Sequence, residues 1–125
     1  MILDTNALSD FAEGNPRLIA ILLLQPDWRL NVVTLGEYRF GLKSSREKEA
    51  REHWLQTLEE VQEVLEITPA TTHAYAEIRH SLKKSGKPIP ENDLWIAALA
   101  CQHDLPLISR DTHFDRVDGL KRISW

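Results

Sequence analysis

With 125 residues, of which 42% are hydrophobic and 27% charged, the chain has the length and composition of one globular domain over residues 1–125. Its single cysteine excludes an intrachain disulfide framework and fits a reducing cytoplasm, and no apolar run or N-terminal pattern predicts a membrane span or a signal peptide. The net charge of -4 excludes the basic character of a typical non-specific nucleic-acid binder, unless several carboxylates gather around divalent cations, which reverse the sign of the local field.

In the first half of the chain, short apolar runs alternate with helical patterns. The predicted elements are, in order, a buried strand at 1–3, a helix capped by Thr5 or Asn6, a helix from Pro16 to about Leu24, a strand at 29–33, a helix that opens at 34–37, and an amphipathic helix over about 45–62. Asn15 is the expected N-cap of the second helix, since Asn accepts hydrogen bonds from free N–H groups and Pro fits the first helical position. In the amphipathic helix, Trp54, Leu55, Leu58 and Val61 recur at helical spacing and predict one apolar side.

The second half of the chain continues this alternation. The predicted elements are a strand at 64–67, a helix from Pro69 or Thr71 to about Lys84, a break at 85–88, a helix capped by Asn92, a strand at 105–108, a polar loop at 109–115 and a last strand at 120–124. The helix after Asn92 is apolar almost all round from Leu94 to Cys101, so we expect it to be buried in the middle of the domain. Strands that alternate with helices predict an α/β fold in which a mostly parallel central sheet is flanked by helices.

Acidic residues fall near the predicted strand ends and helix starts. They are Asp4, Glu37, Asp93 and Asp111. Sites in open parallel sheets form beyond the carboxyl ends of the strands, so we expect these side chains to converge on one crevice. Two unit charges 4 Å apart cost about 4 kcal/mol at an effective dielectric constant near 20, so such a cluster needs protons or divalent cations. Oxygen ligands favour Mg²⁺ or Mn²⁺, whereas one cysteine and scattered histidines give little support to a zinc site.

Each acidic residue also has a purely structural interpretation. Asp4 can cap the helix that follows it, and Thr34 with Glu37 can form a capping box. Asp93 can interact with the dipole of its own helix, and the aspartates of the loop at 109–115 can be ordinary turn residues. The four positions together favour a shared metal site, because the helix of Asp93 is predicted to be buried and a buried carboxylate needs a partner.

Four stretches of the chain carry a resemblance to a known family. They are residues 2–6 (ILDTN), 34–37 (TLGE), 92–100 (NDLWIAALA) and 107–111 (LISRD) with His113 and Phe114 after it. In this order and at this spacing, they resemble PIN-domain ribonucleases, especially the VapC-type toxins of bacterial toxin–antitoxin pairs. The resemblance implies a PIN-like fold and places the family's acidic positions at Asp4, Glu37, Asp93 and Asp111. It places supporting polar positions at Asn6 and Ser109.

The last motif departs from the pattern of many VapC toxins, which have Asn followed by Asp-Phe. Here the chain reads DTHFD over residues 111–115, so the fourth acidic position is either Asp111 or Asp115. We favour Asp111, which lies two or three positions beyond the strand end and can reach a metal shared with Asp4 and Asp93. Phe114 is expected to turn inward and to carry Asp115 toward solvent.

The resemblance implies a Mg²⁺- or Mn²⁺-dependent endoribonuclease that is the toxin of a type II toxin–antitoxin module. Glu37 would orient the attacking water or take its proton. The implied partners are an RNA substrate, a cognate antitoxin protein and a second copy of the chain in a homodimer. One alternative is a catalytically silent PIN-like binding module, whose expected mark is loss of acidic residues. The other is a Mg²⁺-dependent phosphatase, which needs a second Asp where Asn6 stands.

Overall fold

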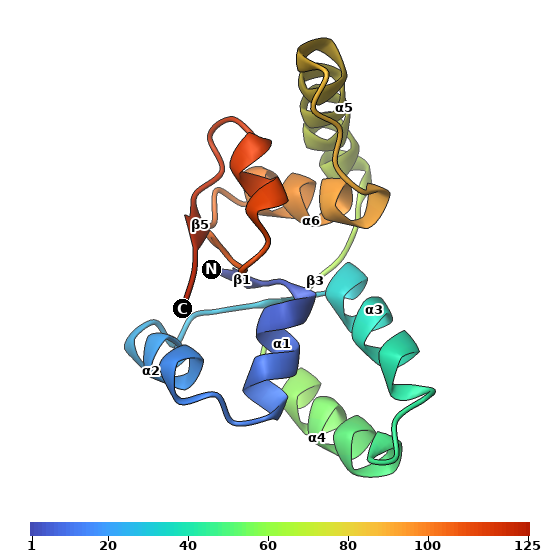
Figure 1. The fold of residues 1–125 in the computed structure, drawn as a ribbon, viewed down its shortest axis with the longest axis vertical. Coiled ribbons are helices and arrows are strands. Elements are labelled where there is room, and N and C mark those ends of the chain that lie inside the picture. The colour runs from blue at the N-terminus through green and yellow to red at the C-terminus, as the bar shows by residue number, and fades with distance from the viewer.

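The computed structural model describes residues 1–125, in which short strands alternate with helices (Figure 1). The strands are β1 (Ile2–Leu3), β2 (Leu30–Asn31), β3 (Val64–Leu65), β4 (Leu107–Ile108) and β5 (Arg122–Ile123). The helices are α1 (Thr5–Ala12), α2 (Pro16–Leu24), α3 (Val32–Leu42), α4 (Lys48–Val61), α5 (Pro69–Ser85), α6 (Glu91–Gln102) and the 3₁₀ helix η1 (Thr112–Arg116). Every predicted strand is present and is shorter than predicted. None of the helices combines the length and the apolarity that a membrane crossing requires.

All strand pairs are parallel. Strand β4 lies between β1 and β5 in one sheet, and β2 pairs with β3 in another. An isolated parallel bridge between Ile2 and Arg29 links the two sheets. The predicted α/β fold with a parallel sheet flanked by helices is therefore confirmed, and the carboxyl ends of all five strands point the same way.

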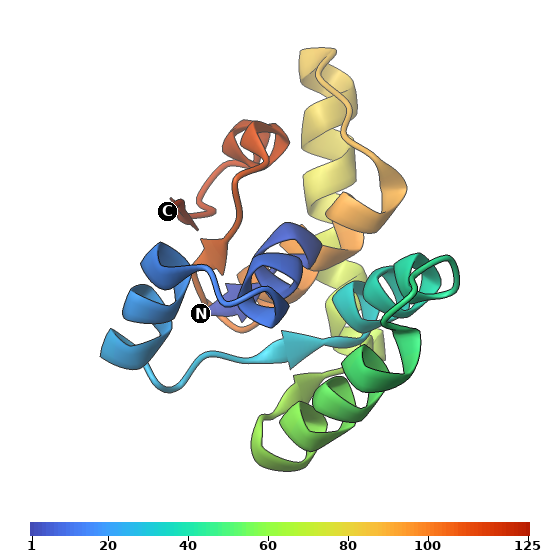
Figure 2. The same ribbon diagram turned by 60° about the horizontal axis from the view of Figure 1, so that its bottom comes forward.

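Side chains of the strands alternate between two hydrophobic cores. Ile2 and Leu107 belong to one core, which α5, α6 and η1 cover. Leu3 and Ile108, the next residues along each strand, belong to the other core, which α1 to α4 cover. Figure 1 shows the strands between these two groups of helices, and Figure 2 shows the same arrangement from another side, with α5 extending away from the body. Because successive side chains of a strand point to opposite faces of the sheet, β1 and β4 each contribute one residue to each core.

The predicted core positions are mostly confirmed. In α6, the side chains of Leu94 and of residues 96–100 are buried, as expected for a central helix. In α4, Leu55 and Leu58 are buried, but Val61 is 71% exposed, so its predicted place on the apolar side was wrong. Val61 is the last residue of α4, beyond the part that packs on the core.

Two of the predicted helix caps were wrong. Helix α1 is capped by Asp4, the structural role considered for that residue, and not by Thr5 or Asn6. Helix α6 begins at Glu91 after Pro90, so that Asn92 lies inside the helix and does not cap it. The predicted N-cap Asn15 of α2 is confirmed by its bonds to the N–H groups of residues 17 and 18.

Helix α3 begins two residues before Thr34, because a buried asparagine caps it. The Asn31 side chain accepts a hydrogen bond from the Thr34 N–H at 2.9 Å and donates one to the Leu3 carbonyl at 3.0 Å. The Thr34 hydroxyl also donates to the Leu3 carbonyl. The capping box predicted for Thr34 and Glu37 was therefore wrong. Because Asn31 caps the helix, the Glu37 carboxylate is available for other contacts.

Candidate active site

The ends of β1 and β4 lie side by side and bring two acidic segments together. Asp4 follows β1, and its N–H donates to the carbonyl of Ile108, the last residue of β4, at 3.1 Å. Asp111 comes three residues after β4. Glu37 lies in the second turn of α3, and Asp93 in the first turn of α6. The predicted convergence of four acidic segments at the carboxyl edge of the sheet is what the structure shows.

The Asp4 carboxylate is almost completely buried and is held by three hydrogen bonds. It accepts from the Ser109 hydroxyl at 2.6 Å, from the Thr5 N–H at 2.7 Å and from the Asn6 amide at 3.0 Å. Burial raises the pKa of Asp4, and the bonds from Ser109 and Thr5 oppose that rise. These bonds fix the position of a carboxylate that would otherwise be costly to bury.

Asn6 and Ser109 join α1 to the loop after β4. The Asn6 side chain donates to the Ser109 hydroxyl at 3.3 Å and accepts from the Arg110 N–H at 3.1 Å. The Ser109 hydroxyl also accepts from the Asp111 N–H at 3.0 Å. Both predicted supporting residues therefore lie between Asp4 and Asp111 and set the distance between the two segments.

Thr5, which the sequence suggested only as a helix cap, positions Glu37. The Thr5 hydroxyl donates to Glu37 Oε1 at 2.8 Å, across the interface between α1 and α3. Because Asp4 is the residue before Thr5, this bond brings Glu37 close to the Asp4 carboxylate. Thr5 was predicted as a possible helix cap. The signal for its role is its position directly after an acidic residue that ends a strand.

Asp93 lies in the field of the other three acidic residues. Burial, followed by the charges of Asp4, Asp111 and Glu37, raises its pKa from 3.8 to about 6, and His113 opposes that rise. No lysine or arginine forms an ion pair with any of the four carboxylates. The negative charge of the cluster is therefore not balanced by a lysine or an arginine.

The two aspartates of the last motif have different surroundings. An oxygen of Asp111 lies within 4.8 Å of an oxygen of Asp93 and of a ring nitrogen of His113. Asp115 instead accepts two hydrogen bonds from Arg122, at 2.7 and 2.9 Å, which lower its pKa. Phe114 is fully buried, as expected. Asp111 joins the cluster, whereas Asp115 points away from it.

His113 belongs to the last motif, but the sequence assigned it no role in the site. Its Nδ1 atom lies 3.0 Å from Asp111 Oδ1, in the same group as Asp93. The histidines of the chain are scattered in the sequence, which gave no reason to select one. The available signal was that His113 follows Asp111 by two residues within one tight 3₁₀ turn.

Two surface hollows lie beside Glu37. A hollow of about 320 Å³ runs along α1 and α3, and another of about 700 Å³ lies between α3 and the start of α6. Thr5 and Glu37 line both hollows. Glu37 is the only one of the four carboxylates that lines either hollow.

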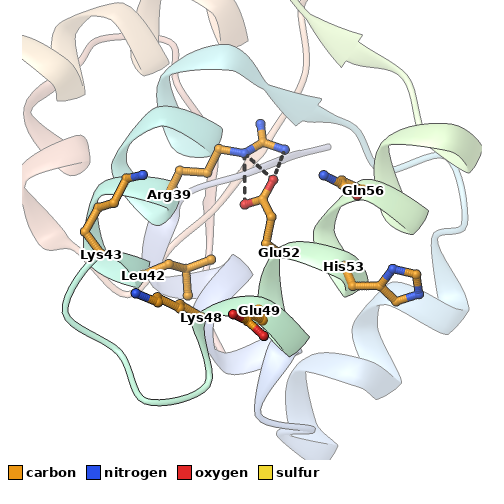
Figure 3. Close-up of a pocket in the computed structure, with 8 residues that line it drawn as sticks. All are labelled: Arg39, Leu42, Lys43, Lys48, Glu49, Glu52, His53 and Gln56. Carbon is orange, nitrogen blue, oxygen red and sulfur yellow. Dashed lines mark hydrogen bonds and ion pairs between the residues drawn. The ribbon is translucent and has the colours of Figure 1, made fainter.

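A further hollow, of about 560 Å³ between α3 and α4, contains none of the four carboxylates (Figure 3). Its Arg39 side chain bonds Glu52 at 3.0 Å and also pairs with Glu59. This arginine is therefore neutralised by its own neighbours and is not free to hold a phosphate.

Comparisons with known proteins agree with this geometry. Residues 1–120 match the PIN domain family. The chain is 34% identical to Ribonuclease VapC5 of Mycobacterium tuberculosis over 120 residues, which cover 94% of this chain and 87% of that protein. It is 31% identical to Ribonuclease VapC1 of Haemophilus influenzae strain R2866 over 129 residues, which cover 99% of this chain and 96% of that protein.

Solved structures show the same fold over the whole chain. The structure of VapBC-1 from nontypeable Haemophilus influenzae matches with a TM-score of 0.84 and 30% identity, covering 99% of this chain and 96% of that one. That of VapBC2 from Rickettsia felis, bound to a promoter DNA fragment, matches with a TM-score of 0.90 and 24% identity, covering 99% and 97%. The chain belongs to the PIN-domain family, among its VapC-type members.

Proposed function

We propose that this chain is a divalent-metal-dependent endoribonuclease and the toxin of a type II toxin–antitoxin module. The observation that carries the proposal is a cluster of four carboxylates at the carboxyl edge of the sheet with no lysine or arginine paired to it. The relatives that match nearly the whole chain are named ribonucleases. A cluster of carboxylates that can bind divalent cations is suited to the cleavage of phosphodiester bonds.

The residues present fit a hard divalent cation. Asp4, Asp93 and Asp111 supply oxygen ligands, which suit Mg²⁺ and Mn²⁺. Burial and the negative charge of the other carboxylates raise the pKa of Asp93, and a cation would offset that charge. The Thr5 hydroxyl donates a hydrogen bond to one oxygen of Glu37, and we assign this residue a task other than metal binding.

The mechanism assigns different tasks to the cation, to Glu37 and to the two residues that hold Asp4. A bound cation would lower the pKa of a water molecule and offset the charge that develops on the phosphate. Glu37 accepts the Thr5 hydroxyl through Oε1, so its Oε2 atom can orient the attacking water and accept its proton. Ser109 and Asn6 hold the buried Asp4 in place while charge develops, so no reorganisation is needed.

The proposed partners are an antitoxin protein and a second copy of this chain. The similar structures from Haemophilus influenzae and Rickettsia felis are VapBC complexes, which supports an antitoxin that binds this chain. Phe40 is 80% exposed and Ile67 is 40% exposed, and both line the larger hollow beside Glu37 with Trp95. Apolar side chains exposed together support the expected homodimer.

RNA cleavage with matched variants tests the proposed activity. Asp93→Asn should cleave a structured RNA at least about 100-fold more slowly than the wild type at saturating Mg²⁺, as expected when a major electrostatic group is removed from an active site. Asp115→Asn removes the same charge from an ion pair outside the cluster and should lose much less. A chelator should stop the wild type. Equal rates for the two variants would contradict the proposed site.

A growth assay tests the proposed toxin role. Expression of the wild-type chain alone should slow bacterial growth, and Asp93→Asn should relieve this effect while it keeps the fold. Equal slowing by both would show that the toxicity is not nuclease activity.

The phosphatase alternative predicts free phosphate from a small phosphomonoester. The second aspartate that such a phosphatase needs is replaced here by Asn6. The Asn6 side chain forms hydrogen bonds with Asp4, Ser109 and the Arg110 N–H.

A further inference from the structure

We infer that the imidazole of His113 is a direct ligand of the divalent cation, beside Asp93 and Asp111, so that the site has a nitrogen donor in addition to its carboxylates. The inference rests on the proposed metal-dependent function and adds a ligand to it. One donor atom from each of the three residues lies within 4.8 Å of the other two. Adjacent donors around a cation bound at about 2.1 Å lie about 3 Å apart, and opposite donors about 4.2 Å apart.

The His113 Nδ1 atom is buried and has no hydrogen-bond partner, although 43% of the side chain is exposed. It lies 3.0 Å from Asp111 Oδ1 without forming a hydrogen bond to it. A buried ring nitrogen without a partner is unfavourable, because it has lost water and gained nothing in exchange. Two donor atoms that lie side by side at this distance, with an Asp93 oxygen within 4.8 Å of a nitrogen of the same ring, match two neighbouring positions around one cation.

The local backbone fixes this orientation of the ring. The His113 N–H donates to Asp111 Oδ1 at 2.9 Å, so the carboxylate and the imidazole are held in one turn of η1. The next residue, Phe114, is fully buried and anchors that turn in the core. The exposed part of the ring is its far edge, so Nδ1 is the nitrogen that faces the carboxylates.

A nitrogen ligand has a measurable consequence for metal preference. Imidazole is a softer donor than a carboxylate and favours transition metals over Mg²⁺. We expect the site to bind Mn²⁺ more tightly than Mg²⁺. We also expect His113→Gln to weaken Mn²⁺ binding by about 10-fold and Mg²⁺ binding by less, which is the order of effect seen when groups that support a metal ligand are removed.

Pulsed electron paramagnetic resonance on the Mn²⁺-loaded protein tests this inference directly, because a nitrogen bonded to Mn²⁺ modulates the electron spin echo. We expect a ¹⁴N modulation in the wild type that changes to a ¹⁵N pattern after labelling with ¹⁵N-histidine. His113→Gln should abolish it. The control His80→Gln, an exposed histidine of α5, should keep it.

The outcomes separate the inference from the proposed function. If Mn²⁺ binds to the wild type without a ¹⁴N modulation, or if the modulation persists in His113→Gln, His113 is not a ligand, while RNA cleavage that depends on Asp93 still supports the nuclease. If the wild type binds no Mn²⁺ at all, both the inference and the metal-dependent function are wrong. Circular dichroism of His113→Gln establishes whether a lost signal comes from a folded protein.

Discussion

Replacing Asp93 with Asn should stabilise the metal-free protein at neutral pH, although it should abolish cleavage. In the folded chain, burial and three neighbouring carboxylates raise the pKa of Asp93 from 3.8 to about 6. The folded state therefore binds the Asp93 proton more tightly than the unfolded state does. The stabilisation that this proton provides is fully present below about pH 4 and is lost as the pH rises through about 6.

The size of the effect follows from the pKa difference. A rise of about 2 in pKa corresponds to about 3 kcal/mol between the two protonation states. Asp93 is only half-buried, so solvent screens its interactions, and we expect about 1 kcal/mol. For a chain of this length, that free energy raises the melting temperature by about 4 °C.

The assay is urea unfolding and thermal melting in metal-free buffer from pH 4 to pH 8. The wild type should lose stability between pH 4 and pH 6, and Asp93→Asn should lose less. Asp115→Asn is the matched control, since it removes one charge from the same surface but from an ion pair with Arg122, and it should not stabilise the protein. If Asp93→Asn is less stable than the wild type at pH 7.5 without metal, the carboxylates do not repel one another as described here.

Three further outcomes are expected. Millimolar Mg²⁺ or Mn²⁺ should raise the melting temperature of the wild type, because a ligand of the native state alone adds stability, and calorimetry should show no such rise for Asp93→Asn. Thr5→Val should slow RNA cleavage by about 10-fold with an unchanged melting temperature, since only the orientation of Glu37 is lost. If the melting temperature falls as well, the slower cleavage comes from a destabilised fold and not from the orientation of Glu37. Asn31→Leu should cost about 2 kcal/mol in urea unfolding, because it leaves the Thr34 N–H without a partner and the Leu3 carbonyl with only the Thr34 hydroxyl. A loss below about 1 kcal/mol would show that water replaces the missing bonds.

The fold was predictable because its main features repeat along the chain. A short apolar run in the sequence predicts each strand, and the buried helix α6 is apolar from Leu94 to Ala100. Parallel strands separated by helices place their carboxyl ends at one edge of the sheet, so the sequence alone predicts that Asp4 and Asp111 are neighbours. These are local or periodic signals, and a single sequence carries them.

The features that were not predicted depend on contacts between distant segments. Asn31 caps α3 only because β1 presents the Leu3 carbonyl beside it, and the nearby Thr34 and Glu37 have the right types for a capping box of their own. The sequence therefore offers two plausible helix starts, and the tertiary partner decides between them. His113 is similar, since its ring faces Asp93 from 20 positions away in the sequence.

The same contacts explain how the chain tolerates a cluster of carboxylates that weakens its own fold. Asp4 is both the N-cap of α1 and the most buried member of the cluster, so the bonds that hold it also start a helix. Ser109 donates to Asp4 and accepts from the N–H of Asp111, so one hydroxyl fixes two of the acidic segments. The cost of gathering negative charge is thus offset by hydrogen bonds that the fold requires in any case. Asp93, which has no such bonds, is the member whose pKa rises to about 6, and it is therefore the position at which removing the charge should stabilise the metal-free fold.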